Sequence, residues 1–363
     1  MRSTPLRCAA AVVPLTLLLA LAAALPAAGQ NLTLPRVSPH ATVSQTVGLT
    51  EITVDYHRPA VNDRELWGSL VPYDAVWRAG ANENTTVTFS HPVAVEGKAL
   101  AAGTYGLHMV PGETAWEVAF SRATSSWGSF TYDAAEDALR VTVTPQPAPF
   151  FAEQLGYDFA DVTRDGATLA LHWGDLRVPL AVTVDTPAIV IASLEDELRG
   201  VAQFNAQGWQ QAAFWTFQNE VDDEQALAWI DRSVTMQPGL VNLNLKARIL
   251  DRLDRQDEVA AVLAQAEAMA ANENDVNTLG YTFLQTGDFE RAVAVFERNV
   301  QDHPESWNVH DSLGEAYAAA GRTADAVRLY TKALEMAPVA QHARIRGILD
   351  GLRGAGASGQ TSR

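Results

Sequence analysis

The chain has almost no cysteine, since Cys8 is the single thiol in 363 residues. Cys8 lies in a stretch that contains Arg2 and Arg7, then an apolar run over 9–25, then small residues. This order is typical of a secretory signal peptide, so residues 1–29 are predicted to be cleaved off. The mature chain would then offer no disulfide, no thiol nucleophile and no cysteine metal ligand.

The predicted signal is of the bacterial Sec type, which indicates a periplasmic or secreted protein. The alternative is an uncleaved membrane anchor, but Pro14, Pro26 and the small residues at the end of the stretch favour cleavage. No second long apolar run follows, so no membrane association is expected after cleavage.

Positive charge is also scarce, with 26 Lys and Arg against 43 Asp and Glu and a formal net charge of −17. A surface that binds nucleic acid needs clustered Lys and Arg, so no nucleic-acid partner is expected. The sequence has no HExxH motif, no GxSxG elbow and no glycine-rich phosphate loop. No metal and no cofactor are therefore predicted, and the catalytic residues, if any, are unknown.

From about Thr42 to Thr186, apolar and polar residues alternate with the period of two that marks half-buried strands, as in Ile52, Val54 and Tyr56. Seven or more short strands indicate an all-β antiparallel sandwich or barrel-like domain over residues 38–186. The last strands are predicted to form a hairpin, 168–173 and 177–184, that turns at Gly174. Pro145, Pro147 and Pro149 restrict their segment to a loop or a sheet edge.

After Ser193 the period becomes helical and a 34-residue repeat follows. Leu279, Gly280, Phe283, Gly287, Ala292, Phe296 and Pro304 are matched at that spacing by Leu313, Gly314, Tyr317, Gly321, Ala326, Tyr330 and Pro338. This is the tetratricopeptide (TPR) signature, in which small residues let paired helices approach. With two weaker preceding copies, residues 194–353 are predicted to form an all-α TPR solenoid. A capping helix is expected over 340–352, and a disordered tail over 354–363.

The region from Ser38 to about Thr186 resembles a family of exported bacterial proteins, the domain of unknown function DUF2911. The resemblance is carried by Ser38-Pro39, Ala41, Val43, Gln45, Val54-Asp55-Tyr56, Arg58-Pro59, Leu70-Val71-Pro72-Tyr73, Val76-Trp77-Arg78, Gly80-Ala81-Asn82-Glu83, Ala102-Gly103-Thr104-Tyr105, Trp127-Gly128 and Tyr132-Asp133. The resemblance implies a β-rich fold and export. It implies no established activity.

A candidate ligand site is predicted around the loop from Val76 to Thr86, because long polar side chains on a loop between strands are a usual place for binding. Guanidinium groups hold carboxylates or phosphates, and aromatic faces stack on sugars or cations. A small anionic or glycan ligand is therefore the expected class. The candidate residues are Tyr56, Arg58, Arg64, Trp77, Arg78, Asn82, Glu83, Tyr105 and His108.

The structural alternative is that Arg78 pairs with Glu83 or Asp55 and that Trp77 belongs to the core. An alternative of another class is an enzyme that acts on an anionic or sugar substrate with a smaller set of these residues. That set would be Arg58, Arg78, Asn82, Glu83 and His108.

In the solenoid, polar residues on the first helix of each unit are predicted to line a groove for a protein or peptide. The candidates are Asn242, Asn244, Asn274, Asn277, Asn308 and Asp311. An aromatic group in the first unit, which includes Phe214, Phe217 and Trp229, is expected to meet the β-domain. The favoured function is an exported protein whose β-domain binds a ligand or partner and whose solenoid mediates protein contacts, without chemistry of its own.

Overall fold

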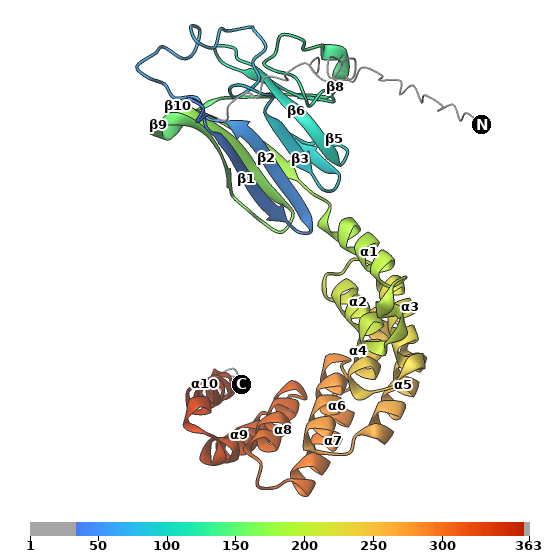
Figure 1. Ribbon diagram of the computed structural model, residues 1–363. Helices are drawn as coiled ribbons and strands as arrows, with labels where there is room; N and C mark the ends of the chain where they lie inside the picture. The colour runs from blue at the N-terminus through green and yellow to red at the C-terminus, as the bar shows by residue number, and fades with distance from the viewer. Residues whose placement is uncertain (1–33, 359–363) are drawn as a thin grey trace, which may run out of the picture.

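The computed structural model describes residues 34–358, in which ten strands are followed by ten α-helices. Figure 1 shows the strands gathered at one end and the helices continuing from them in an arc. The predicted signal peptide therefore lies outside the described residues. Within residues 34–358, no helix combines the length and the apolar character needed to cross a bilayer.

The strands form two antiparallel sheets that do not close into a barrel, as the predicted sandwich requires. The six-stranded sheet runs in the order β1-β2-β3-β6-β7-β8, with strands His40–Val47, Thr50–His57, Thr86–Phe89, Gly103–Val110, Trp116–Ser121 and Asp137–Val143. The four-stranded sheet runs β5-β4-β10-β9, with strands Lys98–Leu100, Val93–Val95, Gly166–Thr183 and Gln146–Ala160. A 3₁₀ turn, η1 (Ala134–Glu136), precedes β8.

Both sheets contribute to one hydrophobic core. Ile52 of β2 and Leu107 of β6 meet Leu169 and Leu171 of β10 there, and all four are essentially inaccessible to solvent. In β2 and in the last part of β10 the buried residues recur at alternate positions, which is the arrangement that the period of two predicted, whereas β6 is buried continuously from Tyr105 to Met109. The apolar faces of both sheets are buried against each other in this core.

The predicted hairpin at Gly174 is wrong, because β10 is one strand of 18 residues that passes through that position. Gly174 has φ +61° and lies where the register between β9 and β10 shifts. It is therefore a bulge residue, a role that also favours glycine. Pro145 lies in the loop before β9, and Pro147 and Pro149 lie in β9 at the edge of its sheet, as the predicted loop or edge position requires.

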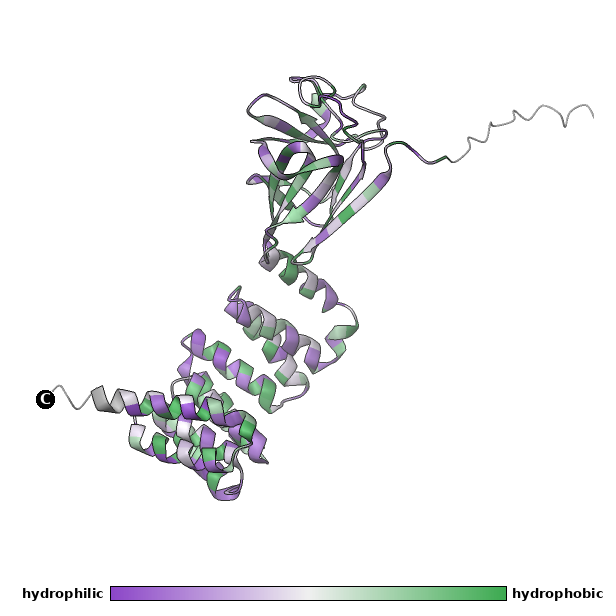
Figure 2. Ribbon diagram, turned by 90° about the vertical axis from the view of Figure 1, so that its left-hand side faces the viewer, coloured by the Kyte–Doolittle hydropathy of each residue, from purple (hydrophilic) through white to green (hydrophobic). Residues whose placement is uncertain are grey.

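Four helix pairs and a final helix form the solenoid. The pairs are α2 (Ala206–Gln218) with α3 (Asp223–Met236), α4 (Leu240–Arg252) with α5 (Gln256–Met269), α6 (Glu273–Gln285) with α7 (Phe289–Asp302), and α8 (Trp307–Ala319) with α9 (Thr323–Met336). They share one hydrophobic core, and each helix carries both hydrophobic and hydrophilic residues (Figure 2). The final helix, α10 (Val339–Ser358), extends past the capping helix predicted over 340–352.

One helix connects the two modules. α1 (Thr186–Glu197) begins where Asp185 accepts a hydrogen bond from the Ala188 amide, and the short η2 (Val201–Phe204) follows it. Ile189 packs on the β-domain core, whereas Ile191 and Leu194 pack on the solenoid core. Residues 187–193, between the two predicted domains, therefore belong to a helix that contacts both cores.

Candidate functional site

The loop that precedes β3 is fixed by buried hydrogen bonds. Trp77 and Met109 exchange two backbone hydrogen bonds of 2.8 Å, so the loop is anchored on β6. Ala79 has a left-handed backbone with φ +51°, and its carbonyl accepts hydrogen bonds from Tyr157 Oη at 2.8 Å and Thr85 Oγ1 at 3.2 Å. Two buried donors on one carbonyl oppose the cost of this conformation.

Polar side chains of this loop line a cavity of about 380 Å³, which we call the loop cavity. Four of the nine residues predicted from the sequence lie in its wall: Arg64, Trp77, Arg78 and Asn82. Trp173 of β10 completes the wall, and its ring stacks on Trp77 with centroids 5.8 Å apart. The structure thus brings together part of the predicted cluster and adds an indole from a distant strand.

The two arginines of the loop cavity differ in how they are held. Arg64 donates from Nε to the Val61 carbonyl at 2.9 Å and from Nη2 to the Ala60 carbonyl at 2.5 Å. The Arg78 guanidinium lies 5.7 Å from the centroid of the Trp127 ring, and burial lowers its pKa. Within residues 34–358, the buried Nε of Arg78 has no hydrogen-bond partner. Asn82 donates to the Ser38 carbonyl at 3.2 Å.

Three further predicted residues lie outside the wall of the loop cavity and bond elsewhere in the β-domain. Tyr56 packs edge-on against Tyr157 and accepts a hydrogen bond from its amide, and both rings are buried. Tyr105 donates to the Ala101 carbonyl at 2.9 Å. Arg58 donates from Nε to the Leu155 carbonyl at 2.8 Å, which ties β2 to β9.

Glu83 and His108 lie in two further networks. Glu83 accepts a 2.5 Å hydrogen bond from Arg36, which lowers the pKa of the Glu83 carboxyl to about 2. His108 is buried, its Nδ1 lies 3.1 Å from Ser129 Oγ, and burial lowers its pKa to about 4. Its ring lies 4.8 Å from that of Tyr132. The five residues of the enzymatic alternative are therefore divided among four environments.

The ion pairs of the structural alternative are not formed either. Glu83 pairs with Arg36, and the Asp55 Oδ2 atom lies 2.7 Å from His40 Nε2. Arg78 has no ion pair within the described part of the chain. Trp77 does pack on the core, as that alternative predicted, but it also lines the loop cavity.

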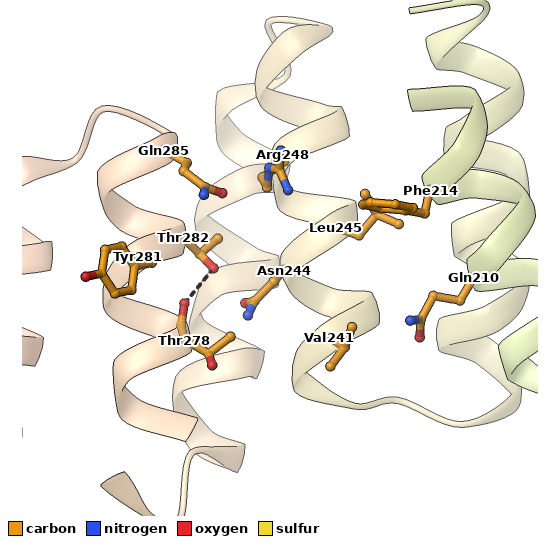
Figure 3. Close-up of a pocket in the computed structure, with 10 residues that line it drawn as sticks. All are labelled: Gln210, Phe214, Val241, Asn244, Leu245, Arg248, Thr278, Tyr281, Thr282 and Gln285. Carbon is orange, nitrogen blue, oxygen red and sulfur yellow. Dashed lines mark hydrogen bonds between the residues drawn. The ribbon is translucent and has the colours of Figure 1, made fainter. Parts of the chain in front are cut away.

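A second cavity of about 330 Å³ lies in the solenoid, and we call it the helical groove. It is formed by one face of the first helix in three successive units, α2, α4 and α6 (Figure 3). Positions spaced i, i+3, i+4 and i+7 share a helix face, and α4 and α6 both follow that spacing. The lining residues are Gln210, Phe214, Val241, Asn244, Leu245, Arg248, Thr278, Tyr281, Thr282 and Gln285.

Of the six residues predicted for protein binding, Asn244 lines the helical groove. Asn242 borders an adjacent cavity, but its side chain bonds to Ser233 and Gln237 at the end of α3 and to Gly239 before α4. Asp311 forms an ion pair with Arg344 of α10, in which Oδ1 and Nη2 are 2.8 Å apart. Asn274, Asn277 and Asn308 lie on α6 and α8, and none of the three lines this groove.

The aromatic group expected at the junction is distributed differently. Phe217 and Trp229 are buried in the solenoid core, and Phe214 lines the helical groove. The contact between modules at the end of α2 is instead polar, from Arg164 Nη1 to Asn219 Oδ1 at 3.4 Å. The sequence did contain a signal for the groove, because Gln210, Asn244 and Thr278 recur at the 34-residue spacing of the repeat.

No metal-binding cluster is present in residues 34–358, where no three His, Cys, Asp or Glu side chains lie close enough to hold an ion. No curated protein matches the chain.

Solved structures resemble the chain over less than half of its length. They include MamA residues 41 to the end from Desulfovibrio magneticus RS-1, at 19% identity, 42% of this chain, 86% of that chain and a TM-score of 0.31. A tetratricopeptide repeat protein from Parabacteroides merdae is 15% identical over 46% of this chain and 66% of that one, with a TM-score of 0.36. A thermophilic TPR protein from Thermus thermophilus is 18% identical over 46% and 90%, with a TM-score of 0.33.

At these TM-scores the three likenesses carry no further argument. The domain assignment rests on family models and on the fold itself. Residues 38–182 match the family described as protein of unknown function DUF2911, and residues 277–341 match a tetratricopeptide repeat family. The chain therefore carries a DUF2911 domain followed by tetratricopeptide repeats.

Proposed function

We propose that this protein is an exported two-module binding protein, in which the helical groove docks an extended polypeptide segment and the β-domain binds a ligand or partner. Export is inferred from the pattern of residues 1–29, and those residues lie outside the described structure. The tetratricopeptide repeats support a protein-interaction scaffold. The proposal assigns no reaction to either module.

The observation that carries the docking proposal is the state of Asn244. Its side chain is only 7% exposed and lines the helical groove, yet neither its Nδ2 nor its Oδ1 has a partner within residues 34–358. A buried polar group without a partner costs about 1–3 kcal/mol. An extended peptide backbone offers both a carbonyl acceptor and an amide donor, so it satisfies both ends of one carboxamide.

The rest of the helical groove fits such a segment. Phe214 and Val241 are exposed on its wall and offer apolar contact to a side chain. Arg248 is its one charged lining residue among those described, and burial lowers the pKa of this guanidinium. A segment with an acidic or amide side chain beside an apolar one is therefore favoured over a basic segment.

The test is selection of binding peptides from a random library on the protein from residue 30 onward, followed by fluorescence anisotropy with a selected peptide. We expect Asn244→Ala to weaken binding by about tenfold or more, since one buried hydrogen-bonded pair is worth on the order of 1–3 kcal/mol. Asn274→Ala is the matched control, because Asn274 is exposed on α6 and does not line the groove. Equal affinity for the two variants, or a library that yields no binder, would contradict the docking proposal.

A further inference from the structure

The loop cavity concentrates positive charge in an acidic protein. Two arginines, Arg64 and Arg78, and two asparagines, Asn62 and Asn82, line it, and none of its described lining residues is acidic. The formal net charge of the whole chain is −17, so this lining is opposite in sign to the average surface. A concave site lined by one sign of charge raises the local concentration of small ions of the other sign.

The neighbouring cavity shows that this charge is local. It has a volume of about 510 Å³ and shares Arg64 with the loop cavity. Its wall, however, carries four carboxylates, from Asp63, Glu65, Glu153 and Asp175. An anion is therefore favoured in the loop cavity and disfavoured beside it.

Among the described residues that line the loop cavity, the buried side-chain polar atoms without a partner are all donors. Trp173 is 2% exposed, and its indole Nε1 has no partner within residues 34–358. The buried Nε of Arg78 is unpaired in the same way. Guanidinium and indole N–H groups donate and cannot accept, so only a ligand with acceptor atoms satisfies them. Oxyanions are the strongest such acceptors, since their hydrogen bonds to arginine are charge-assisted.

The cavity also has an apolar wall. Trp77 and Trp173 are stacked with an interplanar angle of 18°, and Trp67 meets both rings edge-on. Trp77 donates its own indole N–H to the Gly80 carbonyl at 3.2 Å, which fixes the ring. The partly exposed indole of Trp77, held in this way, offers a flat surface to the body of a sugar or of another organic molecule.

We propose that the loop cavity binds a small organic anion, with its carboxylate or phosphate held by Arg64 and Arg78 and its body against the indole of Trp77. This inference rests on the ligand-binding half of the proposed function and is independent of peptide docking in the helical groove. The lining includes no carboxylate, imidazole or thiol among its described residues, so it binds the anion without a group suited to proton transfer at neutral pH.

The experiment is isothermal titration calorimetry of the protein from residue 30 onward with glucuronate, glucose 6-phosphate and glucose. The three probes share one ring and differ in carrying a carboxylate, a phosphate or no charge. We expect at least one of the two anions to bind and glucose to bind at least about tenfold more weakly. The anion that binds more tightly identifies the oxyanion that the site prefers.

Three variants tie the binding to the loop cavity. Arg78→Gln is expected to weaken binding of the anion by at least about tenfold. Arg64→Gln, at an exposed position, keeps the test decisive if Arg78→Gln does not fold. Arg164→Gln removes the same charge from a side chain that is 59% exposed outside the cavity, and it should leave binding unchanged.

Three results would overturn the inference. They are no binding of any probe, equal binding of glucose and the anions, and full affinity in both cavity variants. None of these results would bear on peptide docking in the helical groove, because Asn244 lies in the other module. Loss of peptide docking with retained anion binding would in turn refute only the solenoid half of the proposed function.

Discussion

Two glycines at equivalent positions of successive repeats, Gly280 and Gly314, should differ sharply in their tolerance of a methyl group. A Cβ built on Gly280 would lie 2.5 Å from the Phe296 ring, whereas one on Gly314 would lie 3.1 Å from the Tyr330 ring. Phe296 is fully buried and held edge-on by Tyr281 with centroids 5.3 Å apart, so its ring has little room to move. The steric conflict is therefore severe at Gly280 and mild at Gly314.

The magnitude follows from two opposing terms. Alanine in place of glycine inside a helix gains about 1 kcal/mol from backbone entropy. Overpacking a close-packed interior costs about 1–3 kcal/mol, and occasionally more. We expect Gly280→Ala to lower the free energy of unfolding by about 1–2 kcal/mol, because the steric term exceeds the gain. Gly314→Ala should stay within about 0.5 kcal/mol of the parent, since a small ring shift relieves its contact.

Urea unfolding followed by far-ultraviolet circular dichroism measures both variants, because the helical signal reports the solenoid. A double-mutant cycle with Phe296→Leu checks the cause, and Gly280→Ala should cost less once the ring is gone. Equal losses at Gly280 and Gly314, or a larger loss at Gly314, would refute the steric reasoning. So would an unchanged cost in the Phe296→Leu background.

Two further predictions concern the β-domain. The folded-state pKa of His108 is depressed to about 4 from its ordinary value of about 6.5, so the unfolded chain binds the extra proton first as pH falls. The stability that neutral His108 contributes is complete above pH of about 6.5 and is lost as the pH falls from there to about 4. His108→Gln should therefore flatten the dependence of the free energy of unfolding on pH in that window. An unchanged pH dependence would contradict this prediction. Tyr157→Phe removes one of the two donors to the Ala79 carbonyl and should lower the free energy of unfolding by about 1–2 kcal/mol. Denaturant unfolding followed by tryptophan fluorescence measures this change, and a loss below about 0.3 kcal/mol would mean that the Thr85 hydroxyl alone satisfies the Ala79 carbonyl.

The architecture could be predicted from the sequence because it depends on periodic signals. The repeat was found from residues such as Gly280 and Gly314 at one fixed spacing, and each of these glycines does accommodate an aromatic ring of its partner helix. The predicted hairpin at Gly174 is wrong because a glycine with positive φ fits a turn and a β-bulge equally well. Only the pairing of β10 with β9 through that position distinguishes the two.

The candidate site was predictable in part, for a different reason. Arg64, Trp77, Arg78 and Asn82 are near one another in sequence, and the loop cavity gathers all four. Trp173 was missed because it reaches the cavity from a strand about a hundred residues away. The position of Glu83 outside the loop cavity could not be predicted, because its partner, Arg36, lies 47 residues earlier and outside the loop. Partners that only the tertiary fold brings together leave no local pattern in a single sequence.

The connection through α1 determines how the two proposed binding surfaces are placed relative to each other. Thr186, at the start of this helix, is buried against Gly48 and donates to the Arg164 carbonyl at 2.9 Å. A Cβ on Gly48, whose φ is +58°, would lie 2.5 Å from the Thr186 hydroxyl, so this contact requires glycine. Since α1 then places Ile189 on one core and Leu194 on the other, the link is a packed helix and not a flexible tether. If the loop cavity binds an anion and the helical groove binds a peptide, the two ligands would therefore be held by modules that a packed helix connects. A flexible linker would not provide this defined connection.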